Sequence, residues 1–275
     1  MTNESPKLKK TLERVVLITF ALLLIVFSFL NPPYSQNEKR NRLIKSLLPL
    51  VFGAPLAIWF MVRGESGLFK KPRKWLYLAP CLLVAVNNFP FFSYFAGKSE
   101  FLSVKSLDLF LFLSYCLFVG LFEECVFRGI VFPVIASRLS ANKKGIVQTF
   151  FISSAVFGLS HLLNLLAGAG VGATLLQVLY STLIGGLCGF VLMKTQNVLL
   201  CAFVHAVYDI SGLLLDPTWG FGSGVVFDLP TALTMGIIGV AVGVFVLYGV
   251  FTYTETERKI LYSRLGFSVA IQENP

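Results

Sequence analysis

The sequence predicts an all-α, polytopic bundle of membrane helices, and two observations carry this prediction. Of its 275 residues, 56% are hydrophobic and only 13% are charged, and the mean hydropathy is +0.77. The core of a soluble protein cannot hide that much apolar surface. Apolar windows long enough to cross about 30 Å of hydrocarbon, roughly 17 to 25 residues each, also recur along the chain.

These windows predict about eight transmembrane helices. Within the fourth window, Pro133 is expected to kink the helix. Within the sixth, Gly185, Gly186 and Gly189 are expected to allow close helix packing. No soluble domain and no internal repeat is evident, so residues 1–275 are interpreted as one integral membrane domain. The windows lie near residues 15–31, 46–63, 75–96, 107–136, 146–166, 172–193, 197–215 and 230–253.

Three local features refine this plan. No small-residue cleavage site follows Leu30, so the first window is expected to stay as a helix rather than be removed as a secretory signal. The loop from Asp216 to Pro230 lacks Lys and Arg and is expected at the outer surface. All five cysteines fall inside predicted helices without paired spacing, and we expect them to be apolar packing residues (Cys81, Cys116, Cys125, Cys188 and Cys201).

The net charge of +9 resides in short loops and tails, so the expected partner is the lipid bilayer and not nucleic acid. Cytoplasmic loops are enriched in Lys and Arg. With a cytoplasmic N-terminus, 16 of these residues lie inside, 6 lie outside and Arg128 lies within a span. Both termini are therefore predicted to face the cytoplasm. The inside set is Lys7, Lys9, Lys10, Arg14, Arg63, Lys70, Lys71, Arg73, Lys74, Arg138, Lys143, Lys144, Lys194, Arg258, Lys259 and Arg264.

Three short patterns place ionisable side chains inside apolar windows. A charged group in a membrane span is costly unless it pairs or faces a wet cavity, so a functional site is the default hypothesis. Each pattern contains an i,i+4 pair, whose members share one helix face. The patterns are Glu123-Glu124-x-x-x-Arg128, Phe157-x-x-x-His161 and His205-x-x-x-Asp209, and they include both histidines of the chain.

Helix geometry assigns different partners to the two glutamates. Adjacent helical residues point about 100° apart, so Glu123 and Glu124 cannot both face Arg128. Glu124 has the spacing to pair with Arg128, which leaves Glu123 free to face a cavity as a general base. Counted from the nearest basic residues on the inside, Glu123 and His161 lie at similar depths, roughly 22 and 25 Å along their helix axes. By the same measure His205 lies at roughly 16 Å, and it would join them if the helices tilt or if the fourth and fifth helices extend into the cytoplasm. One shared site is the resulting hypothesis.

Structural roles are the alternative for each pattern taken alone. The joint occurrence of three such patterns in separate apolar helices favours one functional site. The alternatives are a Glu124–Arg128 strut, a packing role for His161 and an interhelical clamp made by His205 and Asp209.

Motifs of other intramembrane proteases are missing from the chain. It has no His-Glu-x-x-His sequence, no Gly-x-Gly-Asp partner after Tyr208-Asp209, and no Gly-x-Ser-x-Gly setting around Ser160. The ordered motifs Glu-Glu-x-x-x-Arg, Phe-x-x-x-His and His-x-x-x-Asn/Asp instead resemble those of the CPBP family. This family comprises CAAX proteases and bacteriocin-processing enzymes and is also called the Abi family. The resemblance covers roughly residues 105–215, which we interpret as the motif-bearing catalytic core.

The resemblance implies an intramembrane endopeptidase with an all-helical fold and a polar cavity open to the cytoplasm. The family often has asparagine at the position of Asp209. Because an ionised aspartate would oppose an oxyanion, Asp209 must be protonated or must orient a cationic His205. The implied roles are water activation by Glu123 and His161, polarisation of the substrate carbonyl by His205 and Asp209, and support of the site by Glu124 with Arg128.

Metal use stays open at this point. Members of this family are often called metalloproteases, and Glu123, His161 and His205 could bind zinc or simply hold water. The sequence favours water activation without a metal, because only three good ligands are in view and a carboxylate–histidine pair needs no cation.

Two hypotheses from different classes follow. The first is an endopeptidase that cleaves peptides or membrane proteins from within a cell membrane. A bacterial cytoplasmic membrane is favoured, because the chain is compact and carries no organellar signal. The alternative is a non-hydrolytic membrane protein, either a bacteriocin immunity factor or a small transporter with a carboxylate–histidine proton relay. Retention of function after loss of Glu123 would favour the second class.

Overall fold

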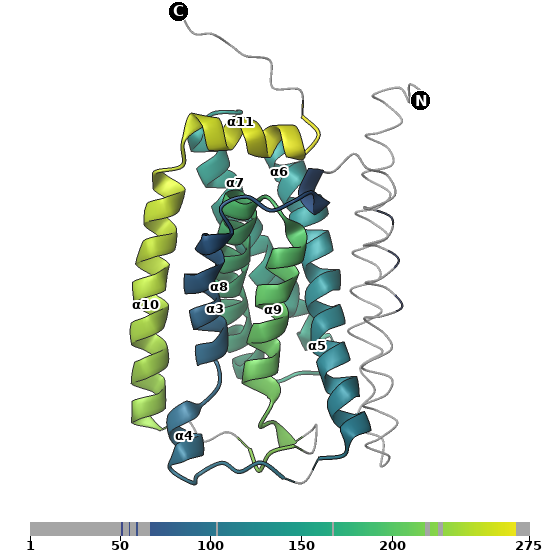
Figure 1. Cartoon of the computed structure of the whole chain (residues 1–275), viewed down its shortest axis with the longest axis vertical. Helices are drawn as coiled ribbons and strands as arrows, with labels where there is room; N and C mark the ends of the chain where they lie inside the picture. The colour runs from purple at the N-terminus through teal and green to yellow at the C-terminus, as the bar shows by residue number, and fades with distance from the viewer. Residues whose placement is uncertain are drawn as a thin grey trace, which may run out of the picture.

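The computed structural model describes residues 67–102, 104–166, 168–217, 221–224 and 228–267, together with Val51, Pro55 and Trp59. The predicted helix 15–31 lies outside these residues, as does 46–63 apart from those three positions. Long helices run roughly along one axis of the molecule (Figure 1). Within the described ranges, β-type pairing is limited to one isolated bridge between Phe101 and Gly222. The all-α prediction is confirmed for this part of the chain.

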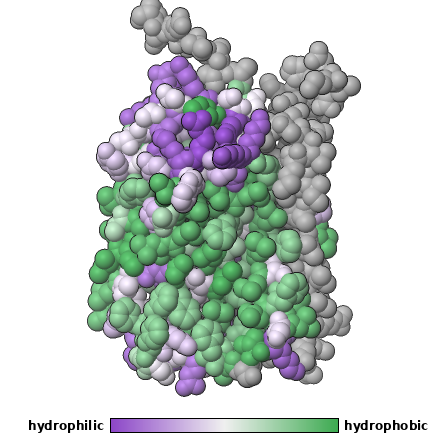
Figure 2. All heavy atoms as spheres, in the orientation of Figure 1, coloured by the Kyte–Doolittle hydropathy of each residue, from purple (hydrophilic) through white to green (hydrophobic). Residues whose placement is uncertain are grey.

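The chain is a multi-pass membrane protein. Two shorter apolar helical segments, Trp75–Asn87 and Val198–Leu213, stand among longer helices (Figure 1). On the face seen in Figure 2, hydrophobic residues cover a broad middle band, and hydrophilic residues gather at the end that carries α11. The four segments long and apolar enough to cross a membrane, among the described residues, are Ser106–Arg138, Lys143–Leu165, Val171–Thr195 and Leu229–Phe251.

The segment Ser106–Arg138 changes its helical form next to the motif residues. It comprises α5 (Ser106–Val126), a π-helical turn η3 (Phe127–Val131) and α6 (Phe132–Arg138). Pro133 lies in the first turn of α6, where its missing N–H interrupts the α-helical hydrogen-bond ladder. The π-helical turn that precedes Pro133 includes Arg128. Such turns occur frequently at functional sites.

The prediction of one helix over residues 75–96 is wrong. The chain forms a 3₁₀ turn η2 (Trp75–Tyr77), α3 (Leu78–Asn87) and a separate short helix α4 (Phe91–Phe95). Pro90 disfavours helical geometry at the residue before it, which ends the first helix. Next to this break, the Asn88 side chain donates a hydrogen bond to the carbonyl of Tyr208 (3.0 Å).

The five predicted spans that follow residue 96 agree with the helical segments to within a few residues. An additional polar helix, α11 (Glu255–Arg264), begins at a capping box formed by Thr254 and Glu257. Hydropathy windows could not reveal it, because its composition is polar and its length is only ten residues. The other helices are α7 (Lys143–Ser160) with the 3₁₀ segment η4 (His161–Leu165), α8 (Val171–Thr195), α9 (Val198–Leu213) and α10 (Leu229–Phe251).

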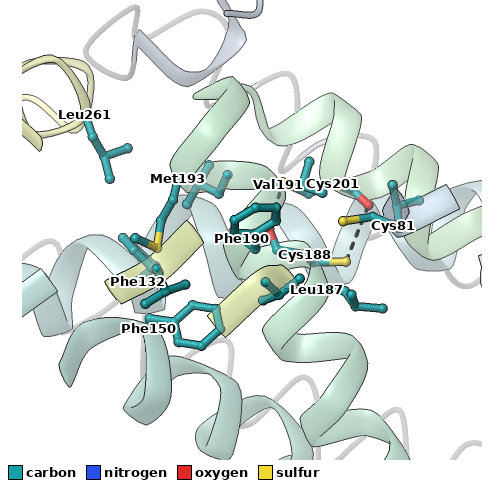
Figure 3. Packing of buried hydrophobic residues seen from close by; sticks show 14 of the residues in the cluster. Cys81, Phe132, Phe150, Leu187, Cys188, Phe190, Val191, Met193, Cys201 and Leu261 are labelled. Atoms are coloured by element: carbon teal, nitrogen blue, oxygen red, sulfur yellow. Dashed lines mark hydrogen bonds between the residues drawn. The ribbon is translucent and has the colours of Figure 1, made fainter. Parts of the chain in front are cut away.

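The main apolar core forms around α8 (Figure 3). Phe190, Val191 and Met193 are fully buried in it. The thiols of Cys188 and Cys201 each approach the other residue's carbonyl oxygen, at 3.7 and 3.3 Å. All five cysteines are buried and free, so their predicted packing role is confirmed.

One end of the bundle joins segments that the charge count assigned to the same side. The backbone N–H of Arg73 donates to Thr195 O (2.8 Å), and Asn197 donates to Lys70 O (2.9 Å). Arg264 of α11 donates to Lys71 O (3.1 Å). The loop before α3, the loop after α8 and α11 therefore meet at this end, which we call the α11 end. The short 3₁₀ helix η1 (Gly67–Phe69) also lies in this first loop.

The opposite end is closed by contacts between two loops. Lys98 pairs with Asp228 (2.8 Å), and the N–H of Leu102 donates to Phe221 O (2.7 Å). Phe221 is buried against Phe112 and Cys116 of α5. The described part of the loop 216–230 therefore reaches inward between the helix ends.

Candidate active site

Close packing of α5 on α9 builds the centre of the site. A Cβ atom on Gly120 would lie only 2.8 Å from Ala202 O and 3.0 Å from Ala206 N. A residue larger than glycine would therefore push the two helices apart. Glu123 and Glu124 follow Gly120 by one helical turn, and His205 lies between the two contacted alanines. This contact brings the glutamate pair against His205.

Glu124 and Arg128 form the ion pair that the i,i+4 spacing predicted. Arg128 Nε lies 2.9 Å from Glu124 Oε2, and both side chains are fully buried. Arg128 also donates from Nη2 to Gly185 O in α8 (2.9 Å), and its guanidinium lies 4.9 Å from the centroid of the Phe157 ring. Arg128 thereby links α5, α7 and α8 around the site.

Glu124 also contacts His205, which the sequence did not predict. Its second oxygen, Oε1, lies 3.0 Å from His205 Nδ1. A carboxylate paired with arginine can only accept, so Nδ1–H is the donor. This contact fixes the orientation of the imidazole and directs Nε2 to the other side of the ring. The sequence held one signal for this contact. A carboxylate has two oxygens, and the predicted pair with Arg128 needs only one of them.

Two accessible carboxylates face Nε2 of His205. Glu123 Oε2 lies 3.7 Å and Asp209 Oδ2 lies 3.6 Å from this nitrogen. Their side chains are 21% and 20% exposed, whereas that of Glu124 is fully buried. The expected division between an accessible Glu123 and a paired Glu124 is therefore present. Part of the Glu123 and Asp209 side-chain surface is therefore exposed, whereas Glu124 is enclosed.

His161 joins this group through an aromatic ring rather than through a carboxylate. It follows the last residue of α7, and its Nδ1 lies 3.2 Å from Phe157 O. A carbonyl can only accept, so Nδ1–H donates and Nε2 is left as an acceptor. The Phe157 ring contacts both histidine rings, with centroids 5.4 Å from His161 and 5.7 Å from His205. Among the described residues, no ion pair joins His161 to a carboxylate.

Small residues also set the position of Phe157. A Cβ atom on Gly185 would lie 3.1 Å from both the Phe157 ring and Ser154 O. The expected packing role is confirmed for Gly185, because α8 approaches α7 closely at this point. The same approach places the Gly185 carbonyl within reach of Arg128.

The residues do not form the three-ligand zinc site considered from the sequence. Across the described ranges, no group of three or more His, Cys, Asp or Glu side chains is arranged to hold a metal ion. The apolar Phe157 ring contacts the rings of both His161 and His205.

Residues 105–211 match the family model described as type II CAAX prenyl endopeptidase Rce1-like. The matched segment begins just before α5 and ends within the last turn of α9. Comparisons with curated proteins and with solved structures gave no significant match. The six residues of the three motifs that form the candidate site all lie within the matched segment: Glu123, Glu124, Arg128, His161, His205 and Asp209.

Proposed function

We propose that the chain is an intramembrane endopeptidase, because residues 105–211 match the family model described as type II CAAX prenyl endopeptidase Rce1-like. In this proposal Glu123 is the general base that activates water. The observation that carries it is the accessible Glu123 carboxylate, 3.7 Å from His205 Nε2, beside a histidine that Glu124 holds through Nδ1. Amide hydrolysis requires a base that activates water and a fixed hydrogen-bond donor that stabilises the oxyanion, both beside the substrate carbonyl.

The first step is attack by water on the substrate carbonyl carbon. Glu123 takes one proton from the water, and the water oxygen forms a bond to the carbon. The carbonyl π electrons move to the oxygen, which becomes an oxyanion. His161 donates from Nδ1–H to Phe157 O. Its Nε2 accepts a hydrogen bond from the second hydrogen of the water and so orients the nucleophile.

His205 stabilises the oxyanion in its cationic form, with Nε2–H as the donor. Three carboxylates lie within 3.0 to 3.7 Å of its ring nitrogens, and Arg128 balances only one of them. A cationic imidazole therefore fits the charge of its surroundings. Asp209 orients this cation, which resolves the conflict between an aspartate and an oxyanion.

The tetrahedral intermediate then collapses. The oxyanion re-forms the carbonyl, the C–N bond breaks, and Glu123 returns its proton to the leaving nitrogen. The products are a new carboxyl terminus and a new amine, and Glu123 is again ionised. The substrate class is a peptide or a membrane protein with a bond at the depth of this site.

We further propose that the α11 end faces the cytoplasm. The basic loops assigned to the inside by charge meet there through the hydrogen bonds of Lys70, Lys71 and Arg73. The proposed location is a multi-pass position in a bacterial cytoplasmic membrane.

The purified protein in lipid vesicles, incubated with a peptide library, tests this function by mass spectrometry. New termini formed by the wild-type protein and missing with Glu123→Gln are expected. Activity should survive a chelator, because the proposed steps use only side chains of this chain. An intact library would favour the non-hydrolytic alternative, an immunity factor or a proton-coupled transporter.

A further inference from the structure

Tyr180 occupies an unusual position for a tyrosine in a membrane helix. It lies nine residues after the start of α8, a 25-residue candidate span, and so about 14 Å from its N-terminal end. Tyrosine in such helices usually lies at the membrane–water interface. Among the described residues its hydroxyl has no hydrogen-bond partner, although 40% of the residue is exposed. A polar group at this depth without a partner is costly, which points to a function.

The aromatic ring of Tyr180 lies next to a neighbour of the candidate active site. Its ring centroid lies 6.5 Å from that of Tyr208, which directly precedes Asp209. Asp209 belongs to α9, and α9 packs on both α8 and α5. The contact with Tyr208 therefore places the Tyr180 ring on the side of α8 that faces α9.

A side-chain hydrogen bond holds this part of α8 in place. Asn164 of η4 donates to Gln177 of α8 (2.8 Å). Gln177 precedes Tyr180 by about one helical turn and lies on the same side of the helix. The bond fixes α8 against the segment that begins with His161. Tyr180 is therefore anchored next to the site rather than on a free helix end.

The site needs a neutral donor, and Tyr180 can supply one. A substrate oxyanion would form beside Glu123 and Asp209, and His205 Nε2–H is the one donor so far assigned to it. A phenol donates a hydrogen bond without adding charge or transferring its proton. We propose that the Tyr180 hydroxyl donates a hydrogen bond to the oxyanion alongside His205 and is thus a further catalytic residue. This inference rests on the proposed protease function.

Tyr180→Phe tests this proposal, because it removes one oxygen and keeps the ring. Loss of an oxyanion donor should lower kcat on the order of 100-fold and leave KM nearly unchanged. Tyr248→Phe is the control, because Tyr248 lies on α10 and is 69% exposed, and its kinetics should equal the wild type. Equal melting temperatures of the three proteins would show that folding is unaffected.

A peptide aldehyde separates transition-state binding from substrate binding. Its hydrate is tetrahedral, so Tyr180→Phe should weaken its inhibition by a factor similar to the loss in kcat. Substrate binding can be measured without cleavage in two proteins, Glu123→Gln alone and Glu123→Gln combined with Tyr180→Phe. The two should bind the substrate equally well. Equal weakening of aldehyde and substrate would contradict the proposal, as would a rise in KM alone.

These outcomes also separate this inference from the proposed function. Full activity of Tyr180→Phe together with an inactive Glu123→Gln would overturn the role of Tyr180 and leave the protease intact. Full activity of Glu123→Gln would overturn the proposed protease mechanism itself.

Discussion

His205 Nδ1 lies 3.0 Å from Glu124 Oε1, across the interface between α9 and α5. The other oxygen of the same carboxylate lies 2.9 Å from Arg128 Nε. One buried carboxylate therefore balances an arginine and orients a histidine. From this double contact we expect Glu124 to position His205 as well as to stabilise the buried Arg128.

Glu124→Gln should therefore lower both stability and turnover. It leaves Arg128 as an unpaired charge in a buried site, which costs about 3–5 kcal/mol. Glutamine also has only one acceptor oxygen for the two donors that face Glu124, and it lacks the negative charge that holds a cationic His205. Adding Arg128→Met should recover part of the melting temperature, since no lone charge remains, but it should not restore kcat. Recovery of both in the double variant would show that Glu124 serves only to balance Arg128.

Gly120→Val should separate α5 from α9. The new Cβ would lie 2.8 Å from Ala202 O, so the helices must move and Glu124 must lose contact with His205. We expect activity to fall by more than about 10-fold, because small misplacements of catalytic groups are costly. Gly239→Val on α10 is the matched control, because no atom lies within 4 Å of its Cβ position. Equal activity of the two variants would contradict the packing role of Gly120.

Glu257 should make the α11 end sensitive to acid. Burial would raise the pKa of Glu257, but hydrogen bonds from Lys74, Thr254 and Lys194 lower it from 4.5 to about 2. Its stabilising contribution is therefore complete above about pH 4.5 and is lost as the pH falls toward 2. Glu257→Gln should lower the melting temperature at pH 7 by several degrees, because it leaves Lys194 buried without its carboxylate partner.

The Glu257→Gln variant should also lose part of the acid dependence between pH 4.5 and 2. Glu255→Gln is the control on the same helix, since the exposed pair of Glu255 with Lys259 contributes little. Equal melting temperatures of the Glu257 and Glu255 variants would show that the buried pair does not hold α11.

The orientation of the chain can be checked with single cysteines in a cysteine-free background. A cysteine at position 71 or 143 should resist an impermeant thiol reagent added to intact cells, because both positions belong to the basic set assigned to the cytoplasm. A cysteine at position 98, on the opposite end, should react. Ready labelling at position 71 from outside would reverse the orientation.

Composition and spacing predicted much of this architecture, for a physical reason. Membrane spans need long apolar runs, so the helices 106–138, 143–165, 171–195 and 229–251 were visible in the sequence. The helix break at Pro90 was missed because a hydropathy window averages over many residues and does not register the backbone restriction that a single proline imposes. α11 was missed because its polar residues belong to the end of the bundle.

The site could be predicted only where its contacts lie within one helix. The pairing of Glu124 with Arg128 follows from i,i+4 spacing. The contact of Glu124 with His205 joins two helices, and it depends on a glycine whose role appears only once α9 lies against α5. Phe157 belonged to a motif, but its contacts with His161, His205 and Arg128 also depend on packing between helices.

Hydrolysis in water enriched in ¹⁸O tests the central claim most directly. A peptide cleaved by the wild-type protein in lipid vesicles should carry one ¹⁸O atom in its new carboxyl terminus, as mass spectrometry would record. Glu123→Gln should lower the rate of this incorporation by at least about 100-fold while its melting temperature stays near that of the wild type. Equal ¹⁸O incorporation by the wild type and a folded Glu123→Gln variant would contradict the account.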